Sequence, residues 1–177
     1  NILSRYNTTD FTTVVIRPAT VCGYSTRQRL DVVVNILTNL AYHKRKITVF
    51  GGNQLRPNLH IKDMLESYFL LLNSDKNLIS NQIFNVGFEN QKVIDLAKIT
   101  KQIIGDDVLL ETTPTDDNRS YHISSKKFIE KLNFKTQFTI EESVKELIKK
   151  FESKYFKDPL NNEMYFNIKR MQNIKLK

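Results

Sequence analysis

Residues 13–17 read Thr-Val-Val-Ile-Arg and are followed directly by Pro18, and this stretch decides the fold class. β-branched residues favour strands, and the proline ring biases Arg17 toward an extended conformation. The run is apolar without alternation, which predicts a strand covered on both faces, as in a parallel sheet. Helix-like segments follow it in the sequence. We therefore expect strands that alternate with helices around one core.

The rest of the chain continues this alternation. Helices are indicated where apolar residues recur every three or four positions, and strands where short β-branched or aromatic runs stand beside turn residues. The expected helices cover residues 30–41, 61–73, 91–104, 125–132 and 139–151, and the expected strands cover 47–50, 83–87 and 108–111. We also expect a polar loop that carries Arg56 and a helix N-cap at Asn90. The order predicts an α/β or α+β domain.

Composition bounds the class of protein. The chain has 177 residues, of which 40% are hydrophobic, enough for one ordinary core. With only five glycines and four prolines, collagen-like and most low-complexity architectures are excluded. The single cysteine, Cys22, forbids an intramolecular disulfide and fits a reducing compartment, so a cytoplasmic location is expected. No apolar run approaches the roughly 18 residues that span a bilayer, so no membrane partner is expected.

Charge favours polyanionic partners without choosing among them. Lysine and arginine total 27 against 19 acidic residues, which gives a formal net charge of +8. A non-catalytic basic module that binds nucleic acid or another polyanion is therefore one interpretation. The segment 153–177 mixes lysines with the aromatic residues Tyr155, Phe156, Tyr165 and Phe166. It is either a mobile basic extension or a segment whose aromatic residues pack on the domain.

Three stretches stand in a recognisable order. They are Arg17-Pro18-Ala19-Thr20-Val21-Cys22-Gly23, then residues 54–63 with Arg56-Pro57-Asn58-Leu59-His60, and then residues 119–126, which begin Arg119-Ser120-Tyr121. Together they resemble the second half of an extended short-chain dehydrogenase/reductase of the NAD-dependent nucleotide-sugar epimerase/dehydratase family. The resemblance runs from about residue 12 to 152. Similar family members also carry a basic loop and helix, here residues 26–35, around the nucleotide.

The resemblance implies a domain organisation. Residues 1–25 are the last part of a Rossmann-type NAD-binding domain with its parallel sheet, and 26–152 are mainly the smaller α/β substrate-binding region. Residues 153–177 form a basic C-terminal extension. The family's catalytic Tyr-x-x-x-Lys and its glycine-rich cofactor loop lie upstream of the Arg-Pro strand, so catalytic residues are expected upstream of Asn1. We expect a truncated chain whose first strand has an exposed apolar edge and which aggregates.

The resemblance also assigns candidate substrate and cofactor residues. It implies that Arg56 and Arg119 contact the diphosphate of a nucleotide-sugar, and planar guanidinium groups suit such paired anionic oxygens. Thr20 stands where many relatives have an asparagine that touches the substrate. Pro18 and Ala19 match positions on the nicotinamide side of the cofactor, although a strand end shaped by proline explains them equally well.

Cofactors and partners follow from the same resemblance. It implies NAD or NADP bound mainly by the upstream half, a nucleotide-sugar substrate that is epimerised or dehydrated, and a homodimer of the full-length protein. A degenerate member that only dimerises is an open alternative. The three histidines show no metal-ligand spacing, so no metal is expected. We expect packing for Cys22, packing or loop anchoring for His60, and helix capping or a dipole role for Asp63.

Overall fold

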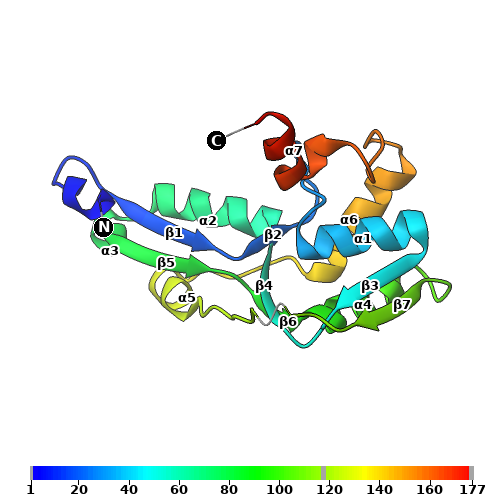
Figure 1. The fold of residues 1–177 in the computed structure, drawn as a ribbon. Helices are drawn as coiled ribbons and strands as arrows, with labels where there is room; N and C mark the ends of the chain where they lie inside the picture. The colour runs from blue at the N-terminus through cyan, green and yellow to red at the C-terminus, as the bar shows by residue number, and fades with distance from the viewer. Residues whose placement is uncertain (1, 117–118, 176–177) are drawn as a thin grey trace.

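The computed structural model describes residues 2–116 and 119–175 and has mixed α/β architecture (Figure 1). Within these residues the strands form three small sheets. Two of them are parallel pairs, β1 (Val14–Pro18) with β5 (Gln82–Val86) and β3 (Lys46–Phe50) with β7 (Leu109–Thr113). In the third sheet β4 (Leu55–His60) is central, parallel to β2 (Thr20–Cys22) and antiparallel to β6 (Glu89–Lys92). The expected α/β class is confirmed.

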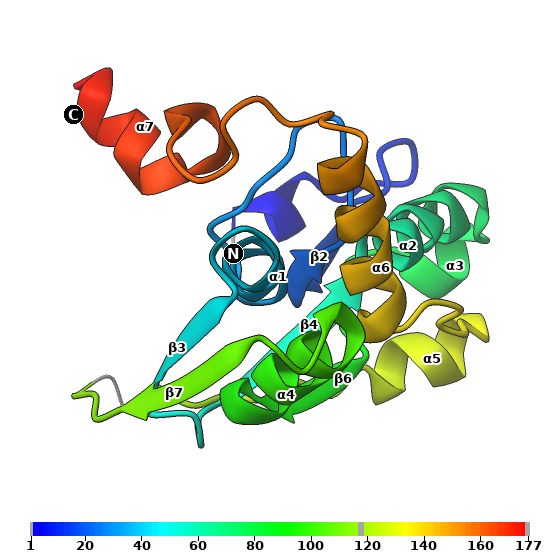
Figure 2. The same ribbon diagram turned by 90° about the vertical axis from the view of Figure 1, so that its right-hand side faces the viewer.

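Helices cover the sheets and lie at both ends of the molecule (Figures 1 and 2). They are α1 (Val33–Lys44), α2 (Ile61–Asn73), α3 (Lys76–Ile79), α4 (Val93–Ile104), α5 (Lys126–Leu132), α6 (Ile140–Glu152) and α7 (Asn167–Asn173), with short 3₁₀ turns η1 (Leu3–Tyr6) and η2 (Glu163–Tyr165). α1, α4 and α6 pack against one another, whereas α2 lies over β2 and β4. None of the helices in the described ranges has the length and apolarity to cross a bilayer.

Three apolar clusters form the interior. The first lies between α1, α4, α6 and the β3–β7 pair, and includes the fully buried Ile47, Leu96 and Val144. The second joins α2, α5 and the β1–β5 pair around Phe84 and Phe128. A third, smaller cluster brings the C-terminal segment onto the end of α6.

β1 is a strand, as the Thr-Val-Val-Ile-Arg run predicts, but its burial differs from the expectation. It pairs in parallel with β5 along one edge, and its apolar residues Val14, Val15 and Ile16 are half-buried. No strand among the described residues pairs with its other edge. Because these side chains are half-buried, the expectation of full coverage on both faces is wrong for this structure, and because the second edge is unpaired among the described residues, the expected open edge is present.

Two local expectations are wrong because tertiary pairing overrides composition. Arg56 lies in β4 and not in a loop, since β4 is held between β2 and β6 despite its polar residues and Pro57. The β2 pairing begins only at Asn58, so the missing N–H of Pro57 breaks no bond there. Asn90 lies in β6, where its side chain exchanges two hydrogen bonds with the backbone of Ile123 at 2.9 and 3.0 Å.

α1 begins three residues later than its apolar periodicity predicts. Leu30 is fully buried, but in the third cluster and not on the helix face. Its backbone N–H donates to the carbonyl oxygen of Tyr165 at 2.9 Å, which keeps it outside the helix. The apolar residue at position 30 therefore belongs to a loop that the C-terminal segment covers.

α6 begins with the capping box that its sequence predicts. The Thr139 hydroxyl oxygen accepts from the backbone N–H of Glu142 at 3.3 Å, and the Glu142 carboxylate accepts from the N–H of Thr139 at 2.8 Å. Thr139→Ala should lower the free energy of unfolding by about 1 kcal/mol because one helix-end donor loses its partner. Urea denaturation measures this, with Thr139→Ser as the variant that keeps the cap. An unchanged midpoint for the alanine variant would contradict the role of the box.

The aromatic residues of the C-terminal segment pack on the domain. Phe156 is buried, and the half-buried Tyr165 and Phe166 pack beside it against Leu30 and Phe151. Of the two interpretations of this segment, docking of its aromatic residues is confirmed. The proposed domain boundaries themselves stay a prediction.

Candidate functional site

Arg56 and Arg119 meet at one open cavity. The cavity measures about 460 Å³ and is lined by Arg56, Arg119, Ser120 and Tyr121. Two hydrogen bonds join residues 120–121 to Leu55, the first residue of β4. The Leu55 N–H donates to the Ser120 hydroxyl at 2.9 Å, and the Tyr121 N–H donates to the Leu55 carbonyl at 3.4 Å. These bonds bring together two arginines that are 63 positions apart in the sequence.

The Arg56 guanidinium is held in place by the backbone. Its Nη1 donates to the carbonyl oxygens of Leu55, at 2.9 Å, and of Arg119. Its Cζ lies 5.7 Å from the centre of the Tyr121 ring, within range of a cation–π contact. Both bonds use Nη1, so over residues 2–116 and 119–175 the Nε and Nη2 donors are available to an anion. The arrangement therefore combines a fixed position with unused donors.

Thr20 lies in β2 in register with Asn58 of β4. Side chains alternate along a strand, so Arg56 and Asn58 share one face of β4, and Thr20 stands in the same row as Asn58. The Arg56 guanidinium is anchored near the start of β4, at the Leu55 carbonyl. Thr20 is thus a neighbour of Arg56 in the sheet, and its contact with a ligand stays a prediction.

Pro18 and Ala19 lie where the parallel strands β1 and β5 end. Pro18 is exposed, whereas Ala19 is 8% exposed and its N–H donates to the Val86 carbonyl at 2.7 Å. A Cβ added at Gly87 would lie 2.8 Å from the Cβ of Ala19, so the two chains approach closely here. Ligands of open α/β sheets bind at this carboxyl end of the strands. The packing role is visible for Ala19, and the cofactor role stays a prediction for both residues.

Sequence reasoning missed two polar residues in the same row of the sheet as Thr20, the buried Asn58 and the half-buried Glu89. Asn58 is 1% exposed; its amide nitrogen donates to the Arg56 carbonyl at 2.8 Å, while its Oδ1 is buried without a partner among the described residues. Glu89 is paired with Asn58 in the register of β4 and β6, and burial raises the pKa of its carboxyl group. The strand alternation that starts at Arg56 is the signal that could have identified Asn58.

His60 and Cys22 have structural roles, as expected. His60 caps α2, since its Nδ1 accepts from the N–H of Lys62 at 3.1 Å. Burial lowers its pKa, although the carboxylate of Glu146, 3.3 Å from Nε2, acts in the opposite direction. Burial raises the pKa of the Cys22 thiol to about 11, and its Sγ lies 3.2 Å from the Ser143 hydroxyl. A thiol with so high a pKa packs as a neutral group.

Asp63 does more than the expected helix-dipole interaction. It stands in the first turn of α2 and is fully buried. Its two carboxylate oxygens accept from the backbone N–H groups of Gln137, at 2.9 Å, and Phe138, at 3.2 Å. The carboxylate therefore fixes the segment that leads into α6.

The basic loop after β2 encloses a second, smaller cavity. It measures about 180 Å³ and is lined by Val21, Cys22, Gly23, Ser25, Arg27, Gln28, Arg29, Asn35 and Ile61. The buried Gln28 amide donates to the carbonyls of Gly23 and Arg29, and the buried Asn35 accepts from the Gly23 N–H at 3.1 Å. Gly23 has φ 97°, a conformation that other residues rarely adopt. Hydrogen bonds of buried side chains therefore hold the loop that carries the exposed Arg27 and Arg29.

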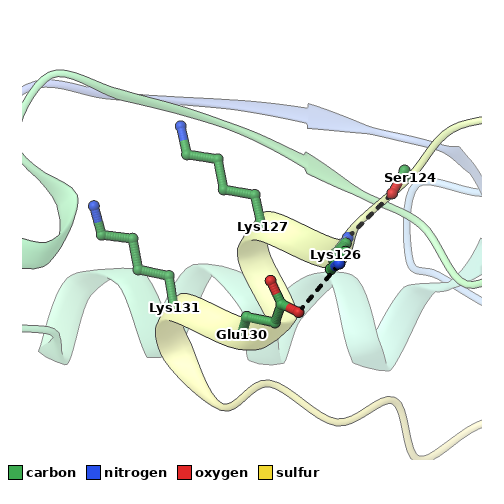
Figure 3. A pocket seen from close by; sticks show the side chains of 5 residues that line it. All are labelled: Ser124, Lys126, Lys127, Glu130 and Lys131. Atoms are coloured by element: carbon green, nitrogen blue, oxygen red, sulfur yellow. Dashed lines mark hydrogen bonds and ion pairs between the residues drawn. The ribbon is translucent and has the colours of Figure 1, made fainter.

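A further surface cavity of about 540 Å³ lies beside α5 (Figure 3). Lys127 and Lys131 extend in the same direction from the helix, while Lys126 lies 3.7 Å from Glu130. Lys127 donates to the Ile83 carbonyl at 3.0 Å and lies over the Phe84 ring. These exposed lysines pack on the neighbouring sheet or face solvent, so this cavity offers no preorganised chemistry. Across the described residues no three His, Cys, Asp or Glu side chains are grouped as metal ligands.

Comparison with known proteins finds a family match for residues 1–87 and solved structures with a similar fold. Residues 1–87 match the model of the NAD dependent epimerase/dehydratase family. The fold is similar to that of UDP-glucose 4-epimerase with UDP-glucose from Thermotoga maritima, at 25% identity and a TM-score of 0.69, covering 83% of this chain and 48% of that one. The matched part, residues 1–87, thus belongs to the NAD-dependent epimerase/dehydratase family.

Two other epimerases have a similar fold. ADP-L-glycero-D-manno-heptose-6-epimerase from Helicobacter pylori has a TM-score of 0.72 at 17% identity, covering 86% of this chain and 48% of that one. UDP-N-acetylglucosamine 4-epimerase from Bacillus cereus has a TM-score of 0.67 at 22% identity, covering 83% and 50%. This chain thus spans about half the length of the structures it matches.

Proposed function

We propose that this chain is the C-terminal, nucleotide-sugar-binding part of an NAD-dependent epimerase or dehydratase, and that Arg56 and Arg119 bind the substrate diphosphate. The observation that carries the proposal is the shared cavity of these two arginines. A diphosphate presents adjacent anionic oxygens, and guanidinium groups bind such oxygens with paired, charge-assisted hydrogen bonds. The backbone bonds to Arg56 set its position before a ligand binds, which reduces the entropic cost of binding.

The neighbouring residues support a sugar-binding role for the same region. Thr20 carries a hydroxyl that can donate and accept, and it stands in register with Asn58, whose buried Oδ1 lacks a partner among the described residues. A buried acceptor without a partner costs free energy unless a donor reaches it, and a sugar hydroxyl is such a donor. We assign Thr20 to the sugar region, with the buried Asn58 next to it in the same row of the sheet.

NAD is the cofactor that the family implies, and the residues present fit one side of such a molecule. Pro18 is exposed and Ala19 closely packed at the carboxyl ends of β1 and β5. When bound, NAD supplies hydride transfer to and from the sugar. In the proposal Pro18 and Ala19 line the nicotinamide side, while catalytic proton transfer and most cofactor contacts belong to residues upstream of Asn1.

Replacing the arginines tests the proposed clamp. Arg56→Ala and Arg119→Ala should each weaken binding of UDP-glucose or another nucleotide-sugar about 10- to 100-fold, because a hydrogen bond to a charged group contributes about 1.5–3 kcal/mol. Isothermal titration calorimetry with a panel of nucleotide-sugars measures the change. Arg45→Asn is the matched control. It removes one positive charge, that of the Arg45–Asp107 ion pair, and asparagine tolerates the left-handed backbone conformation of residue 45.

The outcomes separate the two function classes. If Arg56→Ala binds nucleotide-sugars as tightly as the parent protein does, the proposed role of Arg56 in diphosphate binding is refuted. Binding that ignores the base and the sugar, and that weakens steeply with salt for every lost positive charge including Arg45, would favour the basic-module interpretation. Discrimination among nucleotide-sugars together with a loss only in the Arg56 and Arg119 variants supports the proposal.

A further inference from the structure

The C-terminal segment lies across the arginine loop that follows β2. Figure 2 shows this segment and α7 beyond the end of α6. The Asn167 side chain accepts from Nη2 of Arg27 at 2.9 Å, and its backbone N–H donates to Oδ2 of Asp31 at 2.8 Å. A third bond joins the Leu30 N–H to the Tyr165 carbonyl at 2.9 Å. The loop is therefore fastened to residues more than 130 positions away.

Apolar burial anchors the same contact. Leu30 is fully buried against Leu147, Phe151 and Phe156, with Tyr165 packed beside them. Asn39 of α1 adds a bond from its amide nitrogen to the Pro159 carbonyl at 2.8 Å. Because aromatic side chains bury large areas, this docking is stable enough to hold the polar bonds in register.

Asp31 and Asn167 act on both arginines of the loop cavity. The Asp31 Oδ1 lies 2.9 Å from Nε of Arg29, and its other oxygen accepts from the backbone of Asn167. Asn167 in turn fixes Arg27. Arg27 also donates from Nη1 to the Gln28 carbonyl at 3.4 Å, and Arg29 uses its Nε. A guanidinium has five N–H donors, so these contacts orient the arginines without occupying all their donors.

We propose that Asn167 and Asp31 are positioning residues, which hold Arg27 and Arg29 at the small loop cavity so that they bind an anionic group of the nucleotide-sugar. The inference rests on the proposed function and extends it to a second pair of arginines and to the C-terminal segment. A phosphate and a sugar carboxylate share the chemistry that these guanidinium groups recognise. The binding of ligands with and without a sugar carboxylate to the Arg27 and Arg29 variants distinguishes a phosphate from a carboxylate.

Proteolysis tests the positioning without any ligand. Trypsin cleaves after arginine, so the bonds after Arg27 and Arg29 report how firmly the loop is held. Asn167→Ala and Asp31→Ala should raise the cleavage rate at these bonds severalfold. Asn161→Ala is the matched control, because the Asn161 side chain bonds Asp158 within the C-terminal segment and does not reach the loop. Equal cleavage of Asn167→Ala and Asn161→Ala would overturn the proposal.

Ligand titration tests the consequence for recognition. Asn167→Ala should weaken binding of UDP-glucuronic acid, which carries both a diphosphate and a sugar carboxylate, about fivefold, and Asn167→Asp should restore it, since an aspartate keeps the acceptor for Arg27. If Arg27→Ala weakens UDP-glucose and UDP-glucuronic acid equally, the anion is phosphate; a loss confined to UDP-glucuronic acid identifies the sugar carboxylate. Normal affinity of Asn167→Ala and Arg27→Ala, in a protein whose Arg56→Ala variant binds poorly, would refute this inference and leave the clamp standing. Failure of the parent to bind any nucleotide-sugar would refute both.

Discussion

Asp63→Ala should lower the free energy of unfolding by about 2–5 kcal/mol, because two hydrogen bonds to a buried charged group are lost together. The Asp63 carboxylate accepts from the backbone N–H groups of Gln137 and Phe138, and it is fully buried. Its removal leaves both donors without a partner inside the protein. Urea denaturation followed by circular dichroism measures the change.

Asp95→Ala is the matched control for this variant. Asp95 stands at the third position of α4, as Asp63 does in α2, but its side chain is 50% exposed and 3.8 Å from Lys98. A carboxylate that only complements the helix dipole contributes about 0.3–1 kcal/mol. Similar losses for the two alanine variants would show that the dipole role expected from the sequence is the whole role of Asp63. A loss several times larger at Asp63 supports the bond to the segment before α6.

The elements that the sequence predicts correctly are those whose signals are local. The β-branched run before Pro18 gives β1, apolar periodicity gives α2, and the capping box of Thr139 gives the start of α6. Strands β2, β4 and β6 are missed because they are short or polar, and their partners lie elsewhere in the chain. Pairing across the sheet overrides weak strand propensity, and a single sequence does not show such pairing.

The candidate site shows the same division. Resemblance to the family singles out Arg56 and Arg119. No spacing in the sequence, however, predicts that the Arg56 side chain bonds the Arg119 backbone and that both residues line one cavity. The buried Oδ1 of Asn58 is equally invisible, because it depends on the register of β4 with β2. The contacts of Asn167 and Asp31 arise from docking of the C-terminal segment, whose composition alone also fits a mobile extension.

Truncation of the two adjacent leucines of α2, Leu71 and Leu72, should have very different effects on the free energy of unfolding. Leu71 is 4% exposed and packs in the second cluster, whereas Leu72 is 81% exposed. Leu71→Ala should cost about 2–5 kcal/mol of unfolding free energy, since it removes buried methyl groups and leaves a cavity. Leu72→Ala should stay within about 0.5 kcal/mol. Equal losses measured by urea denaturation would contradict the register of this helix.

Leu72 belongs to a second apolar stripe of α2, together with Leu65, Tyr68 and Phe69, each at least 45% exposed. Positions 65, 68, 69 and 72 recur at helical spacing, and a stripe of this kind beside the open edge of β1 favours association. The double variant Phe69→Lys/Leu72→Lys should therefore lower self-association severalfold in light scattering while its circular dichroism is unchanged. Glu66→Lys, which changes the charge by the same two units at an exposed polar position of the same helix, is the control. Unchanged association of the lysine variant would locate the adhesive surface elsewhere, and loss of helicity would show that the stripe supports the fold.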